Sequence, residues 1–213
     1  MHDSYIIHGG KPLVGEVTLS GAKNASIKLM IASLLFDGPT VLYGVPHNGD
    51  NAELKNLLHD IGVSVTYAGN TVTVDPTKIS KHIVSLLYGS KVRSSFLLFG
   101  PLLHRFGEAH IPNPGGCRIG ARPIERIIQG IQALNVDVNY NQETGYYEAK
   151  ARGAIHGEYT FEKQTHTGTE ALILLATCGT GEVILHNCAL EPEIDDLILF
   201  LTNAGANIRR EGK

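Results

Sequence analysis

The chain has little of what marks several common protein classes. It has three cysteines, Cys117, Cys178 and Cys188, an odd number without the spacing of metal ligands. This argues against a disulfide framework and against a zinc site. The chain has no basic run and a formal net charge of only -3, which gives no sign of a nucleic-acid partner or a membrane partner. No apolar run approaches the roughly 18 residues of a membrane span.

Other absences narrow the possibilities further. The first residues lack the apolar core and cleavage pattern of a signal peptide, so we expect a reducing cytoplasm. Neither a dinucleotide fingerprint nor a phosphate-binding lysine loop is present, and we expect no cofactor. The histidines are scattered along the chain without ligand spacing, so we expect surface positions and no bound metal. The histidines considered are His47, His59, His82 and His104.

One stretch does carry a chemical signal. Residues 112–122 read Pro-Asn-Pro-Gly-Gly-Cys-Arg-Ile-Gly-Ala-Arg and place Cys117 between prolines and glycines, close to Arg118 and Arg122. Pro123 follows where helical spacing of isoleucines begins. A thiol beside cations and a helix N-terminus should have a lowered pKa, and the helix end can hold an anion. The alternative is a small buried cysteine without chemical function.

The order of predicted elements repeats three times. Each copy has an apolar helix, a strand and an amphipathic helix, and the first two copies add a two-stranded hairpin. The first copy spans helix 25–35, strand 40–43, helix 52–61 and hairpin 63–67 with 71–74. The second spans 94–103, 108–111, 124–134, 136–140 and 146–149, and the third 169–177, 182–185, 194–203 and 206–208. Two further strands are expected at 5–7 and 16–19.

Landmark residues support this register. Gly38, Gly107 and Gly181 are 69 and 74 residues apart, and Gly62, Asn135 and Gly205 are 73 and 70 apart. This period exceeds that of solenoid repeats, so we expect three pseudo-symmetric units around a common axis. The first helix of each unit should be central and buried, and the second nearer the surface. The predicted fold is therefore α/β, with repeats at about 21–90, 91–155 and 156–213.

The third copy lacks its hairpin. A strand near 206–210 would present an open edge. We interpret the chain as a fragment or as half of something larger; a partner that covers the edge is the alternative.

The N-termini of the three central helices should lie together and form a cationic basin. Helix dipoles and basic side chains there would suit phosphate or carboxylate, with Arg122 at the rim. The residues concerned are Lys23, Asn24, Lys91, Arg93, Thr165, His166, Thr167 and Gly168. Each cation alone is also consistent with an ordinary solvated surface residue.

The acids at helix starts are interpreted as caps and dipole partners: Asp50, Glu53, Glu191, Glu193, Asp195 and Asp196.

Two segments make the pattern specific. Residues 15–25, Gly-Glu-Val-Thr-Leu-Ser-Gly-Ala-Lys-Asn-Ala, and 115–123, Gly-Gly-Cys-Arg-Ile-Gly-Ala-Arg-Pro, resemble the two signatures of the UDP-N-acetylglucosamine enolpyruvyl transferase family. Residues 191–194, Glu-Pro-Glu-Ile, resemble that family too. The likeness runs along the whole chain but covers about the first half of such an enzyme. The family has two domains, each of three βαβαββ-type repeats (an inverse α/β prism), with the active site between them.

The resemblance implies transfer of enolpyruvyl from phosphoenolpyruvate to the 3-hydroxyl of UDP-N-acetylglucosamine, the first committed step of peptidoglycan synthesis. It assigns Lys23 and Arg122 to phosphoenolpyruvate, with Arg93 lining the same site, and Asn24 to the sugar. Cys117 would protonate C3, could form an adduct at C2, and would be alkylated by fosfomycin. The uridine-nucleotide side would comprise Arg122, Pro123, Ile124, Glu125 and Arg126, with Lys163, Thr165, His166, Thr167 and Gly168.

This chain departs from the family in two ways. Residues 46–50 lack a lysine that the family commonly offers there, and the second domain, with its aspartate general base, is absent. Residues 1–20 would supply a strand to that missing domain, present in cis or in trans, and 21–213 would form the catalytic-cysteine domain. Two alternatives stay open: a non-catalytic UDP-sugar-binding half-domain, and a 5-enolpyruvylshikimate-3-phosphate synthase-like enzyme. The Cys117 loop and residues 20–24 argue against the second.

Overall fold

The computed structural model describes residues 4–115 and 124–212 of the 213-residue chain. The predictions for Cys117, Arg118, Arg122 and Pro123 fall outside these residues. Within the described part, no helix combines the length and apolarity needed to cross a membrane.

The first repeat begins with a central helix. Its elements are α1 (Lys23–Ala32) with a 3-10 turn η1 (Ser33–Leu35), β1 (Thr40–Leu42), α2 (Gly49–Asp60), β2 (Ser64–Ala68) and β3 (Thr71–Asp75). The β2–β3 hairpin joins β1 through β3, so the sheet order is β1-β3-β2 with antiparallel pairs throughout. The helices, strands and hairpin predicted for this copy are confirmed.

The second repeat has the same sheet topology. Its elements are α3 (Leu86–Gly89), η2 (Arg93–Leu98), α4 (Phe99–Phe106), β4 (Glu108–Pro112), α5 (Glu125–Ala133), β5 (Val136–Asn141) and β6 (Tyr146–Ala151). The order β4-β6-β5 repeats that of the first sheet, again antiparallel. Two additions were not predicted: the short helix α3, and a parallel bridge between Ile83 and His110 that places residues 82–84 beside β4.

The third repeat has a longer parallel strand pairing than the second. It comprises β7 (Gly157–Thr160), α6 (His166–Thr177), β8 (Val183–His186) and α7 (Pro192–Asn203). Strands β7 and β8 pair in parallel along four residues each, and α6 is the crossover between them. The prediction missed β7 because its partner follows only after a helix, so no hairpin signal marks it. In both repeats a segment that precedes the first helix pairs in parallel with the strand after that helix. This segment is β7 in the third repeat and residues 82–84 in the second.

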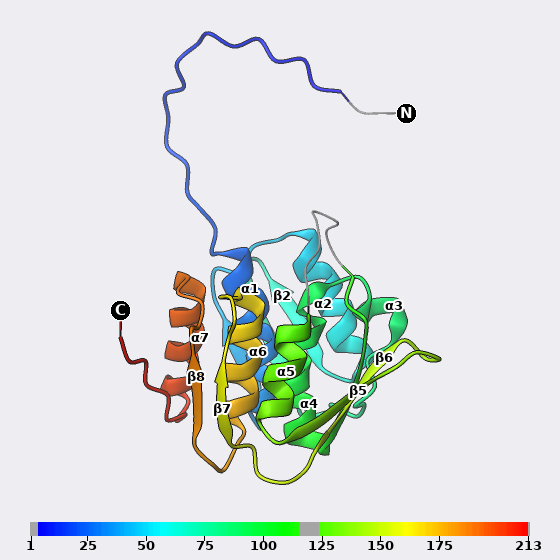
Figure 1. Cartoon of the computed structure of the whole chain (residues 1–213). Helices are drawn as coiled ribbons and strands as arrows, with labels where there is room; N and C mark the ends of the chain where they lie inside the picture. The colour runs from blue at the N-terminus through cyan, green and yellow to red at the C-terminus, as the bar shows by residue number, and fades with distance from the viewer. Residues whose placement is uncertain (1–3, 116–123, 213) are drawn as a thin grey trace.

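Three segments that were predicted as strands have no strand structure within the described residues. They are residues 5–7, 16–19 and 206–208. A strand needs a hydrogen-bonding partner, and in the described part of the chain none pairs with these segments. The N-terminal segment extends away from the body, with Tyr5 90% and Leu13 99% exposed (Figure 1). The segment after α7 instead packs Ala206 and Ile208 loosely against the core.

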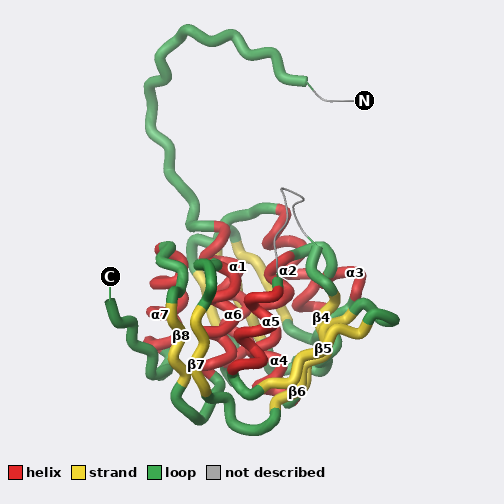
Figure 2. Tube along the Cα trace, in the orientation of Figure 1, coloured by secondary structure: helices red, strands yellow, loops and turns green. Residues whose placement is uncertain are grey.

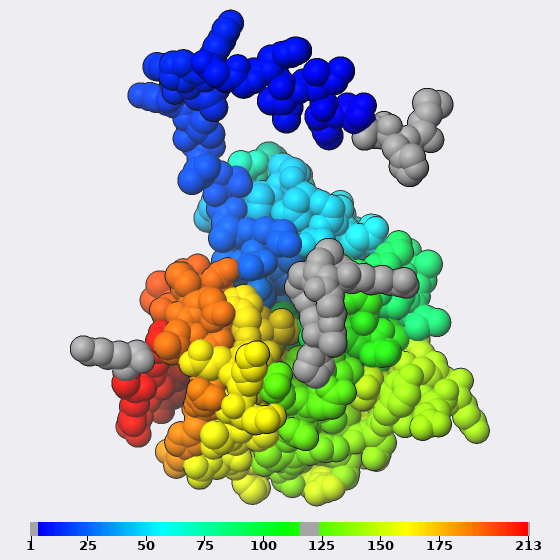
Figure 3. Space-filling model, turned by 45° about the horizontal axis from the view of Figure 1, so that its top comes forward, coloured from blue at the N-terminus to red at the C-terminus, as the bar shows by residue number. Residues whose placement is uncertain are grey.

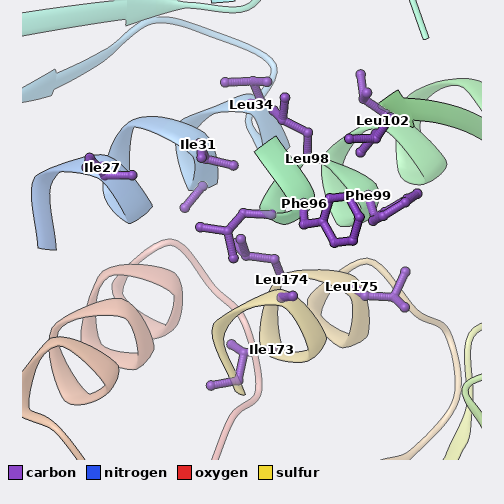
Figure 4. Packing of buried hydrophobic residues seen from close by; sticks show 14 of the residues in the cluster. Ile27, Ile31, Leu34, Phe96, Leu98, Phe99, Leu102, Ile173, Leu174 and Leu175 are labelled. Carbon is purple, nitrogen blue, oxygen red and sulfur yellow. The ribbon is translucent and has the colours of Figure 1, made fainter. Parts of the chain in front are cut away.

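The core lies between the first helices of the repeats, as predicted. Figure 2 shows the helices massed in the centre with the small sheets at the periphery. Side chains of α1, η2, α4 and α6 interdigitate there, among them Ile31, Phe96 and Leu174, each at most 1% exposed (Figure 4). Burial of such apolar surface is the main stabilising contribution to the fold. The second helices, α2, α5 and α7, each bury one face only.

The repeat register is visible in the backbone. Gly62, Asn135 and Gly205, each just after the second helix of its repeat, all have a positive φ of 95°, 66° and 102°. This left-handed conformation suits glycine and, less readily, asparagine, and it terminates a helix. The three landmarks identified by spacing are therefore equivalent in conformation as well.

Candidate functional site

The N-terminal ends of the helices gather at one end of the molecule (Figure 1). In Figure 3, which brings this end forward, the segments of α1, α2, α6 and α7 adjoin one another. The helix pairs α1 and α2, α1 and α7, and α6 and α7 are in contact. Because helix N-termini carry unsatisfied N–H groups and a positive dipole end, their convergence favours an anion at this end.

Glu193 joins three of these helices. Its Oε1 accepts a hydrogen bond from Asn24 Nδ2 of α1 at 3.2 Å, and its Oε2 lies 3.9 Å from His166 Nε2 of α6. Hydrogen bonds from its own backbone N–H and from Asn24 hold the pKa of Glu193 below its usual range. The interpretation of Glu193 as only a dipole partner of α7 is incomplete, since it also fixes the side chain of a predicted sugar-binding residue.

The N-terminal part of α2 supplies two more carboxylates. Asp50 Oδ2 lies 2.6 Å from Lys23 Nζ, and Glu53 Oε2 lies 3.2 Å from Lys91 Nζ. The cap of α2 is instead Asn48, whose side chain accepts a hydrogen bond from the backbone N–H of Asn51. Asp50 does lie in the first turn of α2, as expected of a dipole partner, but neither Asp50 nor Glu53 is the cap, and both also pair with lysines. The predicted basin is a surface of mixed charge, because both lysines have carboxylate partners.

A buried ion pair lies beneath this surface. Lys28 Nζ is 3.1 Å from Glu170 Oε1, with side chains 7% and 0% exposed. Burial raises the pKa of Glu170 from 4.5 to about 7, and the Lys28 charge opposes that rise. His166 Nε2 lies 3.5 Å from the same carboxylate oxygen, and burial followed by the Lys28 charge lowers its pKa. Within the described residues, no regular hydrogen bond satisfies Glu170, so the carboxylate depends on these charges.

The sequence analysis missed this pair, although a signal was present. Lys28 and Glu170 are the charged residues that interrupt the apolar faces of two helices predicted to be central. A charge on a buried helix is costly unless it is paired, so opposite charges on two buried helices are expected to form an ion pair.

The remaining predicted residues fall around the same helix ends. Thr165 caps α6, because its Oγ1 accepts a hydrogen bond from the Gly168 N–H at 3.3 Å. Arg126, in the first turn of α5, lies 3.9 Å from Glu162. The others are Arg93, which begins η2, Ile124 and Glu125 at the start of α5, exposed Lys163, and half-buried Thr167. Since α5 and η2 both contact α6, these residues belong to adjoining helices.

The other two cysteines lie elsewhere. Cys178 follows α6 at the opposite end of the helices, where a surface cavity of about 400 Å³ is lined by Leu103, His104 and Cys178 among others. Burial raises the pKa of Cys178 to about 12 and also raises that of Cys188. Both thiols are therefore poor nucleophiles at neutral pH.

Comparison with known proteins identifies the family. The family model described as EPSP synthase (3-phosphoshikimate 1-carboxyvinyltransferase) matches residues 7–213. The chain belongs to this EPSP synthase family.

Within the EPSP synthase family, curated relatives agree with the resemblance seen in the signatures. A UDP-N-acetylglucosamine 1-carboxyvinyltransferase of Desulforapulum autotrophicum is 41% identical over 210 residues, covering 99% of this chain and 50% of the relative. One of Gloeobacter violaceus is 42% identical over 212 residues, covering 99% of this chain and 46% of the relative. The chain thus spans about half the length of the relatives it matches.

Solved structures of the EPSP synthase family confirm the fold. The enolpyruvyl transferase NikO from Streptomyces tendae superposes with a TM-score of 0.81 at 21% identity, over 97% of this chain and 48% of NikO. An EPSP synthase from Acinetobacter baumannii gives 0.69 at 17% identity, over 93% of this chain and 45% of that structure. The predicted α/β repeat fold is therefore confirmed.

Proposed function

We propose that this chain forms the catalytic-cysteine part of a UDP-N-acetylglucosamine 1-carboxyvinyltransferase. That enzyme would transfer enolpyruvyl from phosphoenolpyruvate to the sugar 3-hydroxyl and release phosphate. The observation that carries the proposal is the 41–42% identity, along 99% of the chain, to two relatives of that name. The product would enter peptidoglycan synthesis in the cytoplasm, and hence serve the cell wall, cell shape, cell division and the cell cycle.

The helix ends provide a rationale for anion binding. Lys23 and Arg122 would hold phosphoenolpyruvate, with Arg93 beside them, and Asn24 would contact the sugar. In the described part, Lys23 is 49% exposed and its partner Asp50 is 56% exposed, so this pair is weak and a bound anion can compete for the lysine. Asn24 is held by Glu193, which orients its amide.

The chemistry requires a proton donor and charge neutralisation. Addition of a hydroxyl across the enol double bond puts a proton on C3 and the sugar oxygen on C2, while cations stabilise the carboxylate and phosphate. Loss of a proton from C3 and of phosphate from C2 then restores the double bond in the product. Cys117 would donate that proton and could also add to C2. The residues at the starts of α5 and α6 would line the uridine-nucleotide side. Among them, Thr165 is held by its hydrogen bond from the Gly168 N–H, and His166 lies 3.9 Å from Glu193.

Half of the site would come from a second domain. The aspartate that takes the proton from the sugar hydroxyl would lie there, and residues 1–20 would join that domain as a strand. We therefore expect the 213-residue chain alone to bind substrate better than it turns substrate over.

Ligand titration tests the substrate assignment. We expect calorimetry on the 213-residue chain to show binding of UDP-N-acetylglucosamine and none of shikimate 3-phosphate. Lys23→Ala should weaken competition by phosphoenolpyruvate at least tenfold. Lys81→Ala removes a similarly exposed lysine, which pairs with Asp60, and should leave binding unchanged. Preference for shikimate 3-phosphate would instead support the EPSP synthase reaction, which the family model's description favours.

A turnover assay separates the enzyme half from a purely binding half-domain, which the half-length match would also allow. We expect phosphate release near background from the chain alone and a clear increase when a second half from a matched relative is added. Near-normal turnover without a second polypeptide would refute the dependence on that half. Binding of UDP-N-acetylglucosamine with no rescue by any second half would favour the non-catalytic alternative.

Fosfomycin labelling tests the assigned acid. We expect the epoxide to alkylate Cys117 selectively, because burial raises the pKa of both Cys178 and Cys188. Mass spectrometry with equal labelling of the three cysteines would contradict the assignment of Cys117 as the activated thiol.

A further inference from the structure

We propose that His82, Glu108 and His110 form a binding site for a divalent transition-metal ion of the zinc type. One ligand atom from each residue lies within 4.8 Å of the other two. The site lies on the second sheet, where Glu108 begins β4 directly after α4, and it is separate from the helix N-termini discussed above.

The spacing of the three side chains is close to that of a metal site. His82 Nε2 lies 3.4 Å from Glu108 Oε1, and the His82 and His110 rings are 5.4 Å apart in an edge-to-face arrangement. Ligands of tetrahedral zinc at about 2.0–2.1 Å from the ion lie about 3.4 Å from one another. Modest side-chain rotations of His82 and His110 would therefore bring all three ligands to bonding distance.

The backbone holds the ligands in register. The His110 N–H donates to the His82 carbonyl at 2.9 Å, and the Val84 N–H donates to the His110 carbonyl at 2.9 Å. Glu108 and His110 are two residues apart on one strand, so they lie on the same face of the sheet. The Phe106 ring packs 5.9 Å from that of His82. The ligands thus come from two hydrogen-bonded segments whose relative position is already fixed.

The donor set indicates the class of ion. Imidazole suits zinc, copper, nickel and iron, whereas magnesium and calcium prefer oxygen ligands. Two histidines and one carboxylate leave a fourth position for water. On the neighbouring strand β6, Lys150 lies opposite Glu108 and Glu148 lies opposite His110. The site is therefore half-buried, of mixed charge, and accessible to an ion from solvent.

A bound ion would connect two parts of the fold. The 82–84 segment pairs with β4 through a single bridge, whereas β7 pairs with β8 along four residues in the third repeat. A metal that joins His82 to β4 would reinforce the shorter pairing. We assign it this structural role, at the connection between the first and second repeats.

His82 was predicted to be a surface residue without a metal-ligand pattern, and the sequence offers no local sign of the cluster that the fold assembles around it. Residue 82 is 26 positions from Glu108 and 28 from His110, so no short ligand motif exists. The parallel bridge at Ile83 brings the segments together, and that bridge carries no hairpin signal.

Zinc titration of the full chain at pH 7.5 tests the proposal. Calorimetry should show one equivalent that is lost, or weakened at least tenfold, in both His82→Gln and His110→Gln. His104→Gln is the matched control, since this histidine is exposed in the last turn of α4 and outside the cluster. The same equivalent should disappear at pH 5.5, where protons compete for imidazole, and magnesium should not replace zinc.

Specific outcomes would overturn the proposal. Absence of zinc binding by the parent chain at micromolar concentration is one, and an unchanged equivalent in both histidine variants is another. An equal loss in His104→Gln would indicate nonspecific imidazole binding. Thermal unfolding without zinc checks that the variants are folded, and Glu108→Gln provides an independent variant expected to weaken binding in the same way.

Discussion

The two ends of the central helices differ sharply in chemistry although the same helices supply both. At the N-terminal end, α1, α2, α6 and α7 are connected by ion pairs and hydrogen bonds through Lys23, Lys28, Glu170 and Glu193. At the C-terminal end, α4 and α6 border a cavity beside Cys178. Three-fold repetition thus gives a similar scaffold at both ends, and the individual side chains give the two ends of the described structure a different chemistry.

The N-terminal end has an exposed ion pair and, beneath it, a buried ion pair. The Lys23–Asp50 pair is about half exposed, whereas the Lys28–Glu170 pair, five residues further along α1, is almost fully buried. Exposed pairs contribute little to stability, but a buried charge that loses its partner is strongly destabilising. The exposed pair can therefore open at little cost to folding, whereas the buried Lys28 must stay beside Glu170 whenever that carboxylate is ionised.

The largest effect is expected from the buried pair. Lys28→Met should lower the free energy of unfolding by about 3–5 kcal/mol at pH 9, because the ionised Glu170 carboxylate loses its buried cation. At pH 5 the loss should be much smaller, because a folded-state pKa of about 7 keeps Glu170 protonated. Urea denaturation at both pH values measures this. An equal loss at pH 5 and pH 9 would show that the lysine stabilises by packing alone.

The next effect is a dependence of stability on pH. The pKa of Glu170 is raised from 4.5 to about 7, so its stabilising contribution is complete below about pH 4.5 and is lost as pH rises to about 7. The contribution lost is roughly 3 kcal/mol, because a difference of one in pKa corresponds to about 1.4 kcal/mol. His166 acts in the opposite sense, because a lowered pKa costs stability as pH falls below 6.5.

Glu170→Gln isolates the first contribution. The variant should lack the fall in stability between pH 5 and pH 8, while Glu158→Gln, an exposed control, should retain it. Chemical denaturation across this range provides the measurement, and identical pH profiles for parent and Glu170→Gln would contradict the assignment.

Opening the exposed pair should matter much less for folding. Asp50→Asn should change the free energy of unfolding by less than about 1 kcal/mol. If Lys23 binds an anion as proposed, the same variant should strengthen phosphoenolpyruvate binding, because the lysine no longer has a competing carboxylate. Denaturation and ligand competition on one sample test both statements. A large loss of stability would remove the distinction between the exposed and the buried pair.

The smallest effect concerns the C-terminal end. With a pKa of about 12, Cys178 should react with iodoacetamide far more slowly at pH 8 than a free cysteine does, with no change in fold. Timed mass spectrometry of Cys178 peptides gives the rate. Labelling as fast as that of a model peptide would show that this end of α6 opens readily.

Much of this architecture could be predicted from local patterns. Helical periodicity, turn residues and the spacing of Gly62, Asn135 and Gly205 identified the repeats and the central position of their first helices. The failures share one physical cause. Isolated segments such as 5–7 and 206–208 have strand-like patterns, but strand structure depends on a partner that local sequence does not specify.

The site was predicted less completely, for a related reason. Position at a helix start indicated Lys23, Asn24 and His166, because helix termini are local features. Their partners lie far along the chain: Asn24 and Glu193 are 169 residues apart. Only the packing of α1 against α7 brings those two together, and the histidines at 82 and 110 meet through an equally nonlocal pairing.

The arrangement of the sheets has a consequence for how the chain folds. Each sheet is built within one repeat, over residues 40–75, 108–151 and 157–186, whereas the contacts of α4 with α6 and of α1 with α7 join different repeats. Within the sheets the paired residues are up to 42 positions apart, as for Glu108 and Lys150, whereas Asn24 of α1 and Glu193 of α7 are 169 positions apart. Closing the loops within a sheet therefore costs less entropy than closing those between repeats. Docking of the central helices would come later and make unfolding of the whole chain cooperative. Amide hydrogen exchange should therefore be slowest along α1, α4 and α6.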